Sequence, residues 1–97
     1  MHSTYDMLRE RREEILALAT RHGVTRLRVF GSVAREEERP DSDIDMLIAT
    51  EDGLSLLDVA VFQTDLEELL QKRIDIVSER AIYPLLREEI LNNAKEF

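Results

Sequence analysis

The sequence of 97 residues contains no cysteine. This absence excludes a disulfide framework, zinc bound through thiolates and a cysteine nucleophile, and it is compatible with a reducing compartment. No stretch approaches the roughly 20 consecutive apolar residues of a membrane span. The first residues, MHSTYDMLRERREE, also lack the apolar segment of a secretory signal. These absences favour a cytoplasmic protein with no membrane partner.

The chain is short and acidic. Apolar residues make up 43% of it and are spread along its length, so a folded chain is expected. Its length suits one domain spanning residues 1–97. The formal net charge of −8 repels a phosphate backbone and disfavours direct nucleic-acid binding. The excess of Asp and Glu fits divalent-cation binding or a basic partner, although a solvated acidic surface is the simpler explanation.

Hydrophobic periodicity and turn residues predict alternating helices and strands. Helices are expected at about 5–22, 33–38 and 56–71, and from Pro84 onward. Strands are expected at about 24–30, 43–49 and 73–77. The pattern contains no internal repeat and no linker. It predicts an α/β (α+β) domain in which helices pack on a small mixed sheet.

Some apolar and aromatic residues have an open role. The apolar residues of 56–70 are most simply a core-facing stripe, and any excess beyond what the sheet needs would form a partner surface. Tyr5 and Tyr83 are expected to pack against the core and not to act as acceptors.

Three aspartates fall inside the predicted strands: Asp43, Asp45 and Asp75. Aspartate is depleted from strands, and a buried carboxylate is costly unless it is paired or bound to a metal. Residues two apart on a strand share a face, so Asp43 and Asp45 would project side by side, about 7 Å apart. If the strand of Asp75 is adjacent, three carboxylates would meet and repel without a cation. Oxygen-only ligands suit Mg²⁺, and two such ions about 3.5–4 Å apart can drive in-line phosphoryl transfer.

The segment Phe30-Gly31-Ser32-Val33-Ala34-Arg35 follows the first predicted strand. Gly31 permits close approach of the backbone, and Ser32 adds a hydroxyl beside the amides that open the next helix. Arg35 is placed to reach a phosphate oxygen through a charge-assisted bond. A Gly-Ser pair alone is a common turn, but together with the aspartates it predicts a triphosphate site.

The alternation of Asp41, Asp43 and Asp45 also raises the possibility of an EF-hand calcium loop. Met46 occupies the position that requires glycine, and Asp52 replaces the usual glutamate at the twelfth position. The residues that follow the aspartates read as a strand where an exiting helix would begin. An EF-hand is therefore rejected.

GSVAR, the following DSDID and the later RIDIV together resemble the DNA-polymerase-β-like nucleotidyltransferase superfamily, over about residues 24–77. The small size resembles its minimal nucleotidyltransferase branch, the antitoxin partners of helical HEPN ribonuclease toxins. The resemblance implies a polymerase-β-like nucleotidyltransferase fold. It also implies that Gly31 and Ser32 hold the triphosphate, that Asp43 and Asp45 bind two Mg²⁺ ions, and that Asp75 helps to bind the catalytic ion near the acceptor hydroxyl.

The same resemblance implies a function. An antitoxin of this branch transfers AMP from ATP to a hydroxyl, typically of a tyrosine, on its cognate HEPN toxin, and so silences the toxin within a hetero-oligomer. Two alternatives stay open. The chain could be a non-catalytic antitoxin that inhibits the toxin by stoichiometric binding, or a small-molecule nucleotidyltransferase that works with a separate substrate-binding subunit.

One departure from the family pattern concerns the residues after Arg35. Many members have glycine there, whereas this chain has Glu36, Glu37 and Glu38. If these carboxylates point to solvent, their effect on a triphosphate is screened and small. If they line the pocket, they oppose nucleotide binding and favour the stoichiometric alternative.

Overall fold

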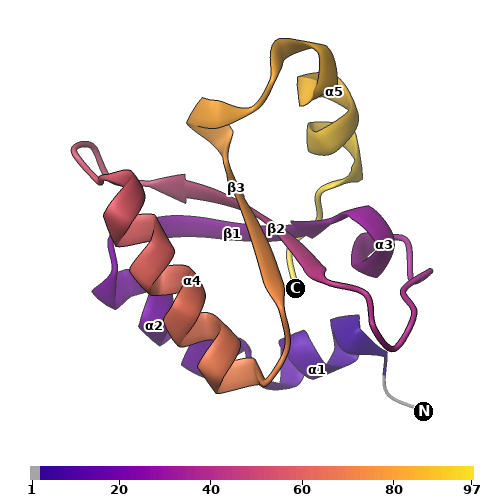
Figure 1. Cartoon of the computed structure of the whole chain (residues 1–97). Coiled ribbons are helices and arrows are strands. Elements are labelled where there is room, and N and C mark those ends of the chain that lie inside the picture. The colour runs from indigo at the N-terminus through magenta and orange to yellow at the C-terminus, as the bar shows by residue number, and fades with distance from the viewer. Residues whose placement is uncertain (1–2) are drawn as a thin grey trace.

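The computed structural model describes residues 3–97, and its centre is a three-stranded sheet in the order β1-β2-β3 (Figure 1). β1 (Val24–Phe30) pairs antiparallel with β2 (Ile44–Thr50), and β2 pairs parallel with β3 (Ile74–Ser78). Helices pack on this mixed sheet. The predicted α/β fold class is therefore confirmed.

Three helices cover the lower face of the sheet as drawn in Figure 1: α1 (Thr4–Glu10), α2 (Arg12–Arg21) and α4 (Leu56–Leu70). α4 is the crossover that connects the parallel strands β2 and β3. Buried apolar side chains from these helices and from alternate strand positions form the core, among them Leu8, Ile15, Phe62, Leu66, Val29, Ile44, Met46 and Ile48. Among residues 3–97, no helix is both long and apolar enough to cross a membrane.

The upper face carries shorter elements: α3 (Gly31–Ala34), the 3₁₀ turn η1 (Glu79–Ala81) and α5 (Pro84–Asn93) (Figure 1). Because successive strand residues point to opposite faces, Leu47 faces upward between the core residues Met46 and Ile48, and it too is buried. This upper face is therefore covered in part by the C-terminal third of the chain.

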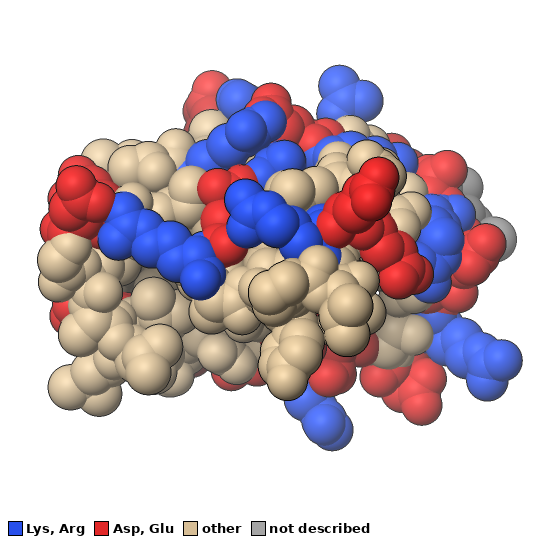
Figure 2. Space-filling view, turned by 90° about the horizontal axis from the view of Figure 1, so that it is seen from above, with Lys and Arg blue, Asp and Glu red and all other residues tan. Residues whose placement is uncertain are grey.

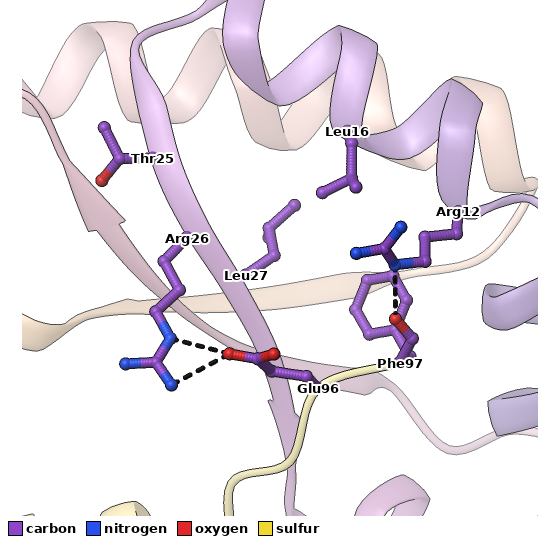
Figure 3. Close-up of a pocket in the computed structure, with 7 residues that line it drawn as sticks. All are labelled: Arg12, Leu16, Thr25, Arg26, Leu27, Glu96 and Phe97. Atoms are coloured by element: carbon purple, nitrogen blue, oxygen red, sulfur yellow. Dashed lines mark hydrogen bonds and ion pairs between the residues drawn. The ribbon is translucent and has the colours of Figure 1, made fainter.

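The last residues return to the sheet edge. Lys95 pairs with Val29 of β1 as an isolated antiparallel bridge. Arg12 Nε donates a hydrogen bond to the Phe97 carbonyl oxygen over 2.8 Å, and Arg26 pairs with Glu96 over 2.9 Å (Figure 3). A hollow of about 240 Å³ lies between these residues, α2 and the first half of β1. Its charged side chains bond either to each other or to the last backbone carbonyl, so these contacts fix the chain end.

Three predicted boundaries are wrong. The expected helix over 5–22 is broken at Arg11, whose guanidinium reaches across to donate to the Leu69 carbonyl oxygen of α4 over 2.8 Å. The short helix expected over 33–38 covers Gly31–Ala34 instead. β2 begins at Ile44, so Asp43 lies just before the strand and not within it.

The two tyrosines differ in their surroundings. Tyr5 packs as predicted, with its hydroxyl donating to the Glu96 carbonyl oxygen over 2.6 Å and Lys95 Nζ 4.2 Å above its ring. Tyr83 does not pack: 71% of it is exposed. The prediction that both tyrosines are packing residues is therefore wrong for Tyr83.

Candidate functional site

Asp45 and Asp75 are direct neighbours in the sheet. The parallel register of β2 and β3 aligns them, and adjacent strands lie about 4.8 Å apart. Each alternates with core residues, Ile44 and Met46 in β2 and Ile74 in β3, so both carboxylates project from the upper face. The sequence alone left the adjacency of these strands open, and the structure brings the two aspartates together.

Gly31 lies directly against the Asp45 carboxylate. It is the first residue of α3, and β1 ends just before it at Phe30, which is the register partner of Asp45. A Cβ atom at position 31 would lie 2.3 Å from Asp45 Oδ2, far inside van der Waals contact. The backbone here also has φ +67°, a region that side-chain-bearing residues rarely adopt. Glycine is therefore required at this position for two separate reasons.

The Asp45 carboxylate is half-buried, and its acidic neighbours outweigh the opposing charge of Arg35. Burial raises its pKa most, the neighbouring charges of Asp75 and Asp43 raise it further, and the cation of Arg35 lowers it by less. Within residues 3–97, no hydrogen bond or ion pair reaches this carboxylate. A group with these surroundings is stabilised by a bound cation.

Asp43 stands at the mouth of the site. Its side chain is exposed, and its Oδ1 lies 3.9 Å from Arg73 Nε, at the outer limit of an ion pair. Among the described residues, no three acidic or histidine side chains form a ready-made metal cage. Mg²⁺ typically uses one or two protein carboxylates and completes its octahedron with water and substrate phosphates. The donor set therefore fits Mg²⁺ bound together with a nucleotide.

Ser32 and Arg35 border the same place. Ser32 is the second residue of α3 and is half-buried. Arg35 follows that helix, is exposed, and pairs with Glu37 through Nε over 3.1 Å. Exposed ion pairs contribute at most about 1 kcal/mol, so the guanidinium can exchange this carboxylate for a phosphate at little cost.

The three glutamates after Arg35 have separate roles. Glu36 and Glu37 are exposed, whereas Glu38 accepts a hydrogen bond from the Thr4 backbone N–H over 3.1 Å, at the start of α1. Burial raises the pKa of Glu38, but backbone hydrogen bonds outweigh it and the net shift is downward. The run therefore does not form one acidic wall beside the nucleotide site.

Glu36 occupies the position where helix ends favour glycine. The Glu36 N–H bonds to the Val33 carbonyl and the Glu37 N–H to the Ser32 carbonyl, the two hydrogen bonds of a Schellman motif. Glu36 has φ +56°, which costs a residue with a side chain about 1–2 kcal/mol. The glycine common in the family fits this C-cap, and the departure places strain there.

Replacing Glu36 with glycine is expected to stabilise the fold. The relief of strain outweighs the added freedom of the unfolded chain, about 0.4–1 kcal/mol, so a net gain of roughly 0.5–1 kcal/mol is expected. Urea denaturation of the native chain and Glu36→Gly would measure it. Glu37→Gly is the matched control, because Glu37 lacks a positive φ and should only lose stability. If both variants are less stable than the native chain, Glu36 is not strained in the folded state.

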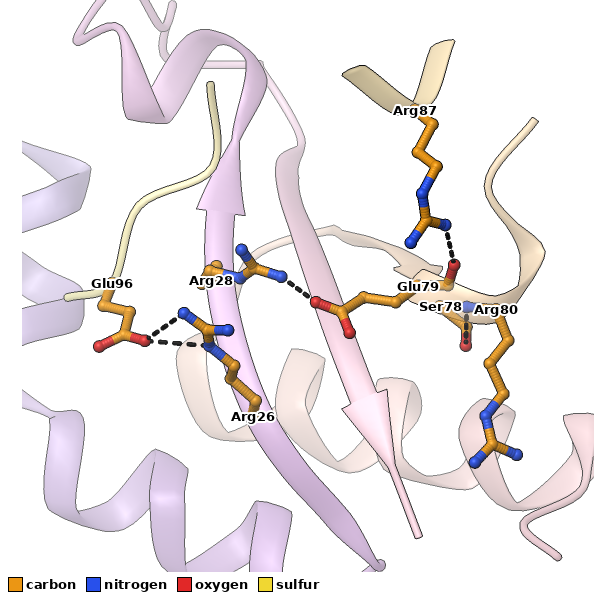
Figure 4. A network of polar contacts seen from close by, with 7 residues as sticks. All are labelled: Arg26, Arg28, Ser78, Glu79, Arg80, Arg87 and Glu96. Carbon is orange, nitrogen blue, oxygen red and sulfur yellow. Dashed lines mark hydrogen bonds and ion pairs between the residues drawn. The ribbon is translucent and has the colours of Figure 1, made fainter. Parts of the chain in front are cut away.

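A partly buried ion pair on the upper face was missed by sequence reasoning. The Arg28 guanidinium pairs with Glu79 of η1, and only 11% of the Arg28 side chain is exposed (Figure 4). Burial, followed by repulsion from Arg26, lowers the pKa of Arg28. The alternation of Arg28 with the core residues Leu27 and Val29 is the signal that places it on the face of the aspartates. The pair fastens η1 to the sheet.

Comparisons with known proteins show which family this chain is similar to. Residues 9–96 match the nucleotidyltransferase domain family. A protein of Methanocaldococcus jannaschii, provisionally named a protein adenylyltransferase, is 41% identical over 87 residues, which cover 90% of this chain and 94% of the relative.

Solved structures are similar as well. One, described provisionally as a minimal nucleotidyltransferase, has a TM-score of 0.84 and 54% identity, and the match covers 95% of this chain and 94% of the other. Another is a complex of an MNT antitoxin with a tri-AMPylated HEPN toxin of Shewanella oneidensis, with a TM-score of 0.68 and 19% identity over 90% of this chain and 68% of the other. At that identity the second likeness concerns the fold alone.

Proposed function

This chain belongs to the nucleotidyltransferase family, and on that premise we propose that it transfers AMP from ATP to a hydroxyl, first of all a tyrosine hydroxyl, of a cognate HEPN ribonuclease toxin and thereby neutralises it. The observation that carries the proposal is the alignment of Asp45 with Asp75 on adjoining strands, beneath a glycine that leaves no room for a Cβ atom. The AMPylated HEPN toxin in a structurally similar complex supports the choice of a toxin as the acceptor protein.

The nucleotide would lie across the turn between β1 and α3. Gly31 lets the backbone approach the triphosphate, and the Ser32 hydroxyl and first-turn amides donate to its oxygens. Arg35 would leave the exposed pair with Glu37 and add a charge-assisted bond. These contacts fix the α-phosphate above the upper face of the sheet, where Asp45 and Asp75 lie.

The carboxylates would hold two Mg²⁺ ions. Asp43 and Asp45 would bind both ions, and Asp75 would bind the ion nearer the acceptor. When bound, Mg²⁺ neutralises phosphate charge and makes the acceptor hydroxyl easier to deprotonate. The hydroxyl oxygen forms a bond to the α-phosphorus, and the bond from the α-phosphorus to the oxygen that bridges to the β-phosphate breaks. The β- and γ-phosphates of ATP leave as pyrophosphate. The hydroxyl proton is lost to solvent. Asp75 is exposed, which suits a carboxylate that faces an incoming protein.

Intact-mass spectrometry of the cognate toxin tests the transfer. The toxin is incubated with ATP, Mg²⁺ and a tenth of an equivalent of this chain, and a gain of one or more AMP groups per toxin is expected. The variant Asp43→Ala/Asp45→Ala and the addition of EDTA should each abolish the gain, because both remove the cation site.

The same experiment separates the alternatives. If the toxin gains no mass but is inhibited by one equivalent of this chain, the transferase proposal is wrong and stoichiometric binding is supported. An AMP group found on a small molecule instead would point to a small-molecule nucleotidyltransferase. The pairing of Glu37 with Arg35 and of Glu38 with the start of α1 supports an intact site over a degenerate one.

A further inference from the structure

The C-terminal helix exposes large apolar side chains. Tyr83, Leu85 and Leu86, named here the α5 ridge, are 71%, 88% and 50% exposed. None of the ten residues of α5 is buried. Isolated exposed leucines are ordinary, but Tyr83 at the N-cap and Leu85 and Leu86 in the first turn place three large exposed apolar side chains within four residues. The fold of this chain alone does not require these exposed side chains to be apolar.

Polar contacts, not the ridge, hold this part of the chain in place. Arg28 of β1 pairs with Glu79, whose carbonyl oxygen accepts a hydrogen bond from Arg87 over 3.3 Å (Figure 4). Ile82, just before α5, is 8% exposed and supplies an apolar anchor. The ridge is therefore free to serve as a contact surface without weakening the attachment of α5.

The ridge stands on the same side of the sheet as the carboxylates. α5 lies above the upper face and contacts α3, the helix that Gly31 opens. Figure 2 looks onto this side and shows a broad area of uncharged side chains along one margin, next to a mixed-charge area. A protein seated on α5 would thus border the place where Asp75 meets an acceptor.

Two glutamates and one arginine follow the ridge on α5, so the charge beside it is negative by one. Glu88 and Glu89 are exposed on α5 and form no ion pair within residues 3–97, while Arg87 is turned toward the Glu79 carbonyl. Glu88 also lines a hollow of about 300 Å³ on the helix surface with Pro84, Arg87, Leu91 and Asn92. The whole chain carries −8. A second copy docked symmetrically here would bring like charges together, whereas a basic partner complements them.

A second group of exposed leucines is worse placed. Leu56, at the start of α4, is 86% exposed. α4 packs on the lower face through Phe62 and Leu66, and it begins beyond Thr50, at the end of β2 remote from Asp45. A protein bound there would lie on the wrong side of the sheet for transfer. The apolar excess of helix 56–70 is therefore not the preferred docking surface.

We propose that the α5 ridge is the surface on which the acceptor protein docks, through an apolar patch with a basic rim. The inference rests on the proposed function, because it takes the docked protein to be the acceptor. The ridge supplies apolar contact and Glu88 and Glu89 select a positively charged partner. The acceptor hydroxyl then enters beside Asp75.

Leu85→Asp, compared with Leu56→Asp, tests the proposal. Both leucines are exposed to nearly the same extent, 88% and 86%, and both lie in the first turn of a helix, where an aspartate is tolerated. Neither variant should change the melting temperature. Isothermal titration calorimetry with the cognate toxin, without nucleotide, should show Kd at least tenfold higher for Leu85→Asp and within twofold of native for Leu56→Asp.

Transfer assays separate docking from chemistry. Leu85→Asp should raise KM for the toxin and keep kcat, whereas Asp75→Asn should bind the toxin like the native chain and transfer nothing. A native chain that binds through Leu85 without transferring AMP would refute the proposed function and leave the docking surface standing.

Three results would overturn the docking surface. These are native-like binding by Leu85→Asp, an equal loss in Leu56→Asp, and no binding of the toxin by the native chain. Sedimentation equilibrium adds another: a dimer of the native chain that Leu85→Asp dissociates would assign the ridge to a second copy.

Discussion

Asp45→Asn is expected to abolish AMP transfer and to stabilise the fold at the same time. Loss of transfer should exceed about 100-fold, since even residues that only support metal ligands cost 10–100-fold when removed. The stability gain follows from the half-buried carboxylate, which has no hydrogen bond or ion pair within residues 3–97. Asparagine keeps the shape and removes the repulsion from Asp43 and Asp75. A rise in melting temperature of about 2–5 °C without metal is expected.

The stability difference between the native chain and Asp45→Asn should depend on pH. Burial, with the charges of Asp75 and Asp43, raises the folded-state pKa of Asp45 above the ordinary value, which is about 3.9. The folded state then holds the proton more tightly than the unfolded state does. The native chain therefore matches Asp45→Asn below about pH 3.9, and loses stability relative to it as pH rises through the raised pKa.

Melting curves across this pH range, with and without Mg²⁺ and a non-hydrolysable ATP analogue, measure the effect. The cation and nucleotide should raise the melting temperature of the native chain and not that of Asp45→Asn. Asp75→Asn serves as the comparison, because its exposed carboxylate should give a smaller stability change with the same loss of transfer. If Asp45→Asn melts below the native chain at neutral pH, the carboxylate has a stabilising partner and the argument for a cation site fails.

The sequence predicted the elements better than their ends. Spacing of apolar residues found each strand and long helix because it reflects which face is buried. The break at Arg11 escaped it, since the break goes with a hydrogen bond to Leu69, a residue distant in the chain. The cap at Glu36 escaped it because no glycine marks the positive φ. Periodicity carries no information about either.

The candidate site was predictable in its residues and not in its geometry. Aspartates among apolar strand residues are costly enough to signal a function. Their alignment depends on β3 pairing parallel with β2 in one register, which is decided by the packing of α4 and not by local sequence. The exposure of Tyr83 could not be predicted either, because an apolar residue on a contact surface looks the same in sequence as one in the core.

Gly31→Ala is the second change with a large expected effect, and it acts through contact with Asp45. The added methyl would lie 2.3 Å from Asp45 Oδ2, so the carboxylate has to move. Misplacement of a reacting group by about 1 Å costs about 100-fold in rate, and transfer should fall at least that far. The positive φ adds about 1–2 kcal/mol of strain, which lowers the melting temperature by roughly 4–8 °C per kcal/mol.

Gly53→Ala measures the effect of a positive φ on stability without a steric clash. Gly53 has φ +86°, and a Cβ atom there would meet nothing within 4 Å, so this variant should lose stability through strain alone and keep full transfer. The clash should also disappear when Gly31→Ala is combined with Asp45→Ala, because the obstructing carboxylate is gone. The double variant should then be destabilised by no more than the sum of Asp45→Ala and the Gly53→Ala strain. If Gly31→Ala melts like Gly53→Ala and still transfers AMP, Asp45 has room to move and the glycine is not what positions it.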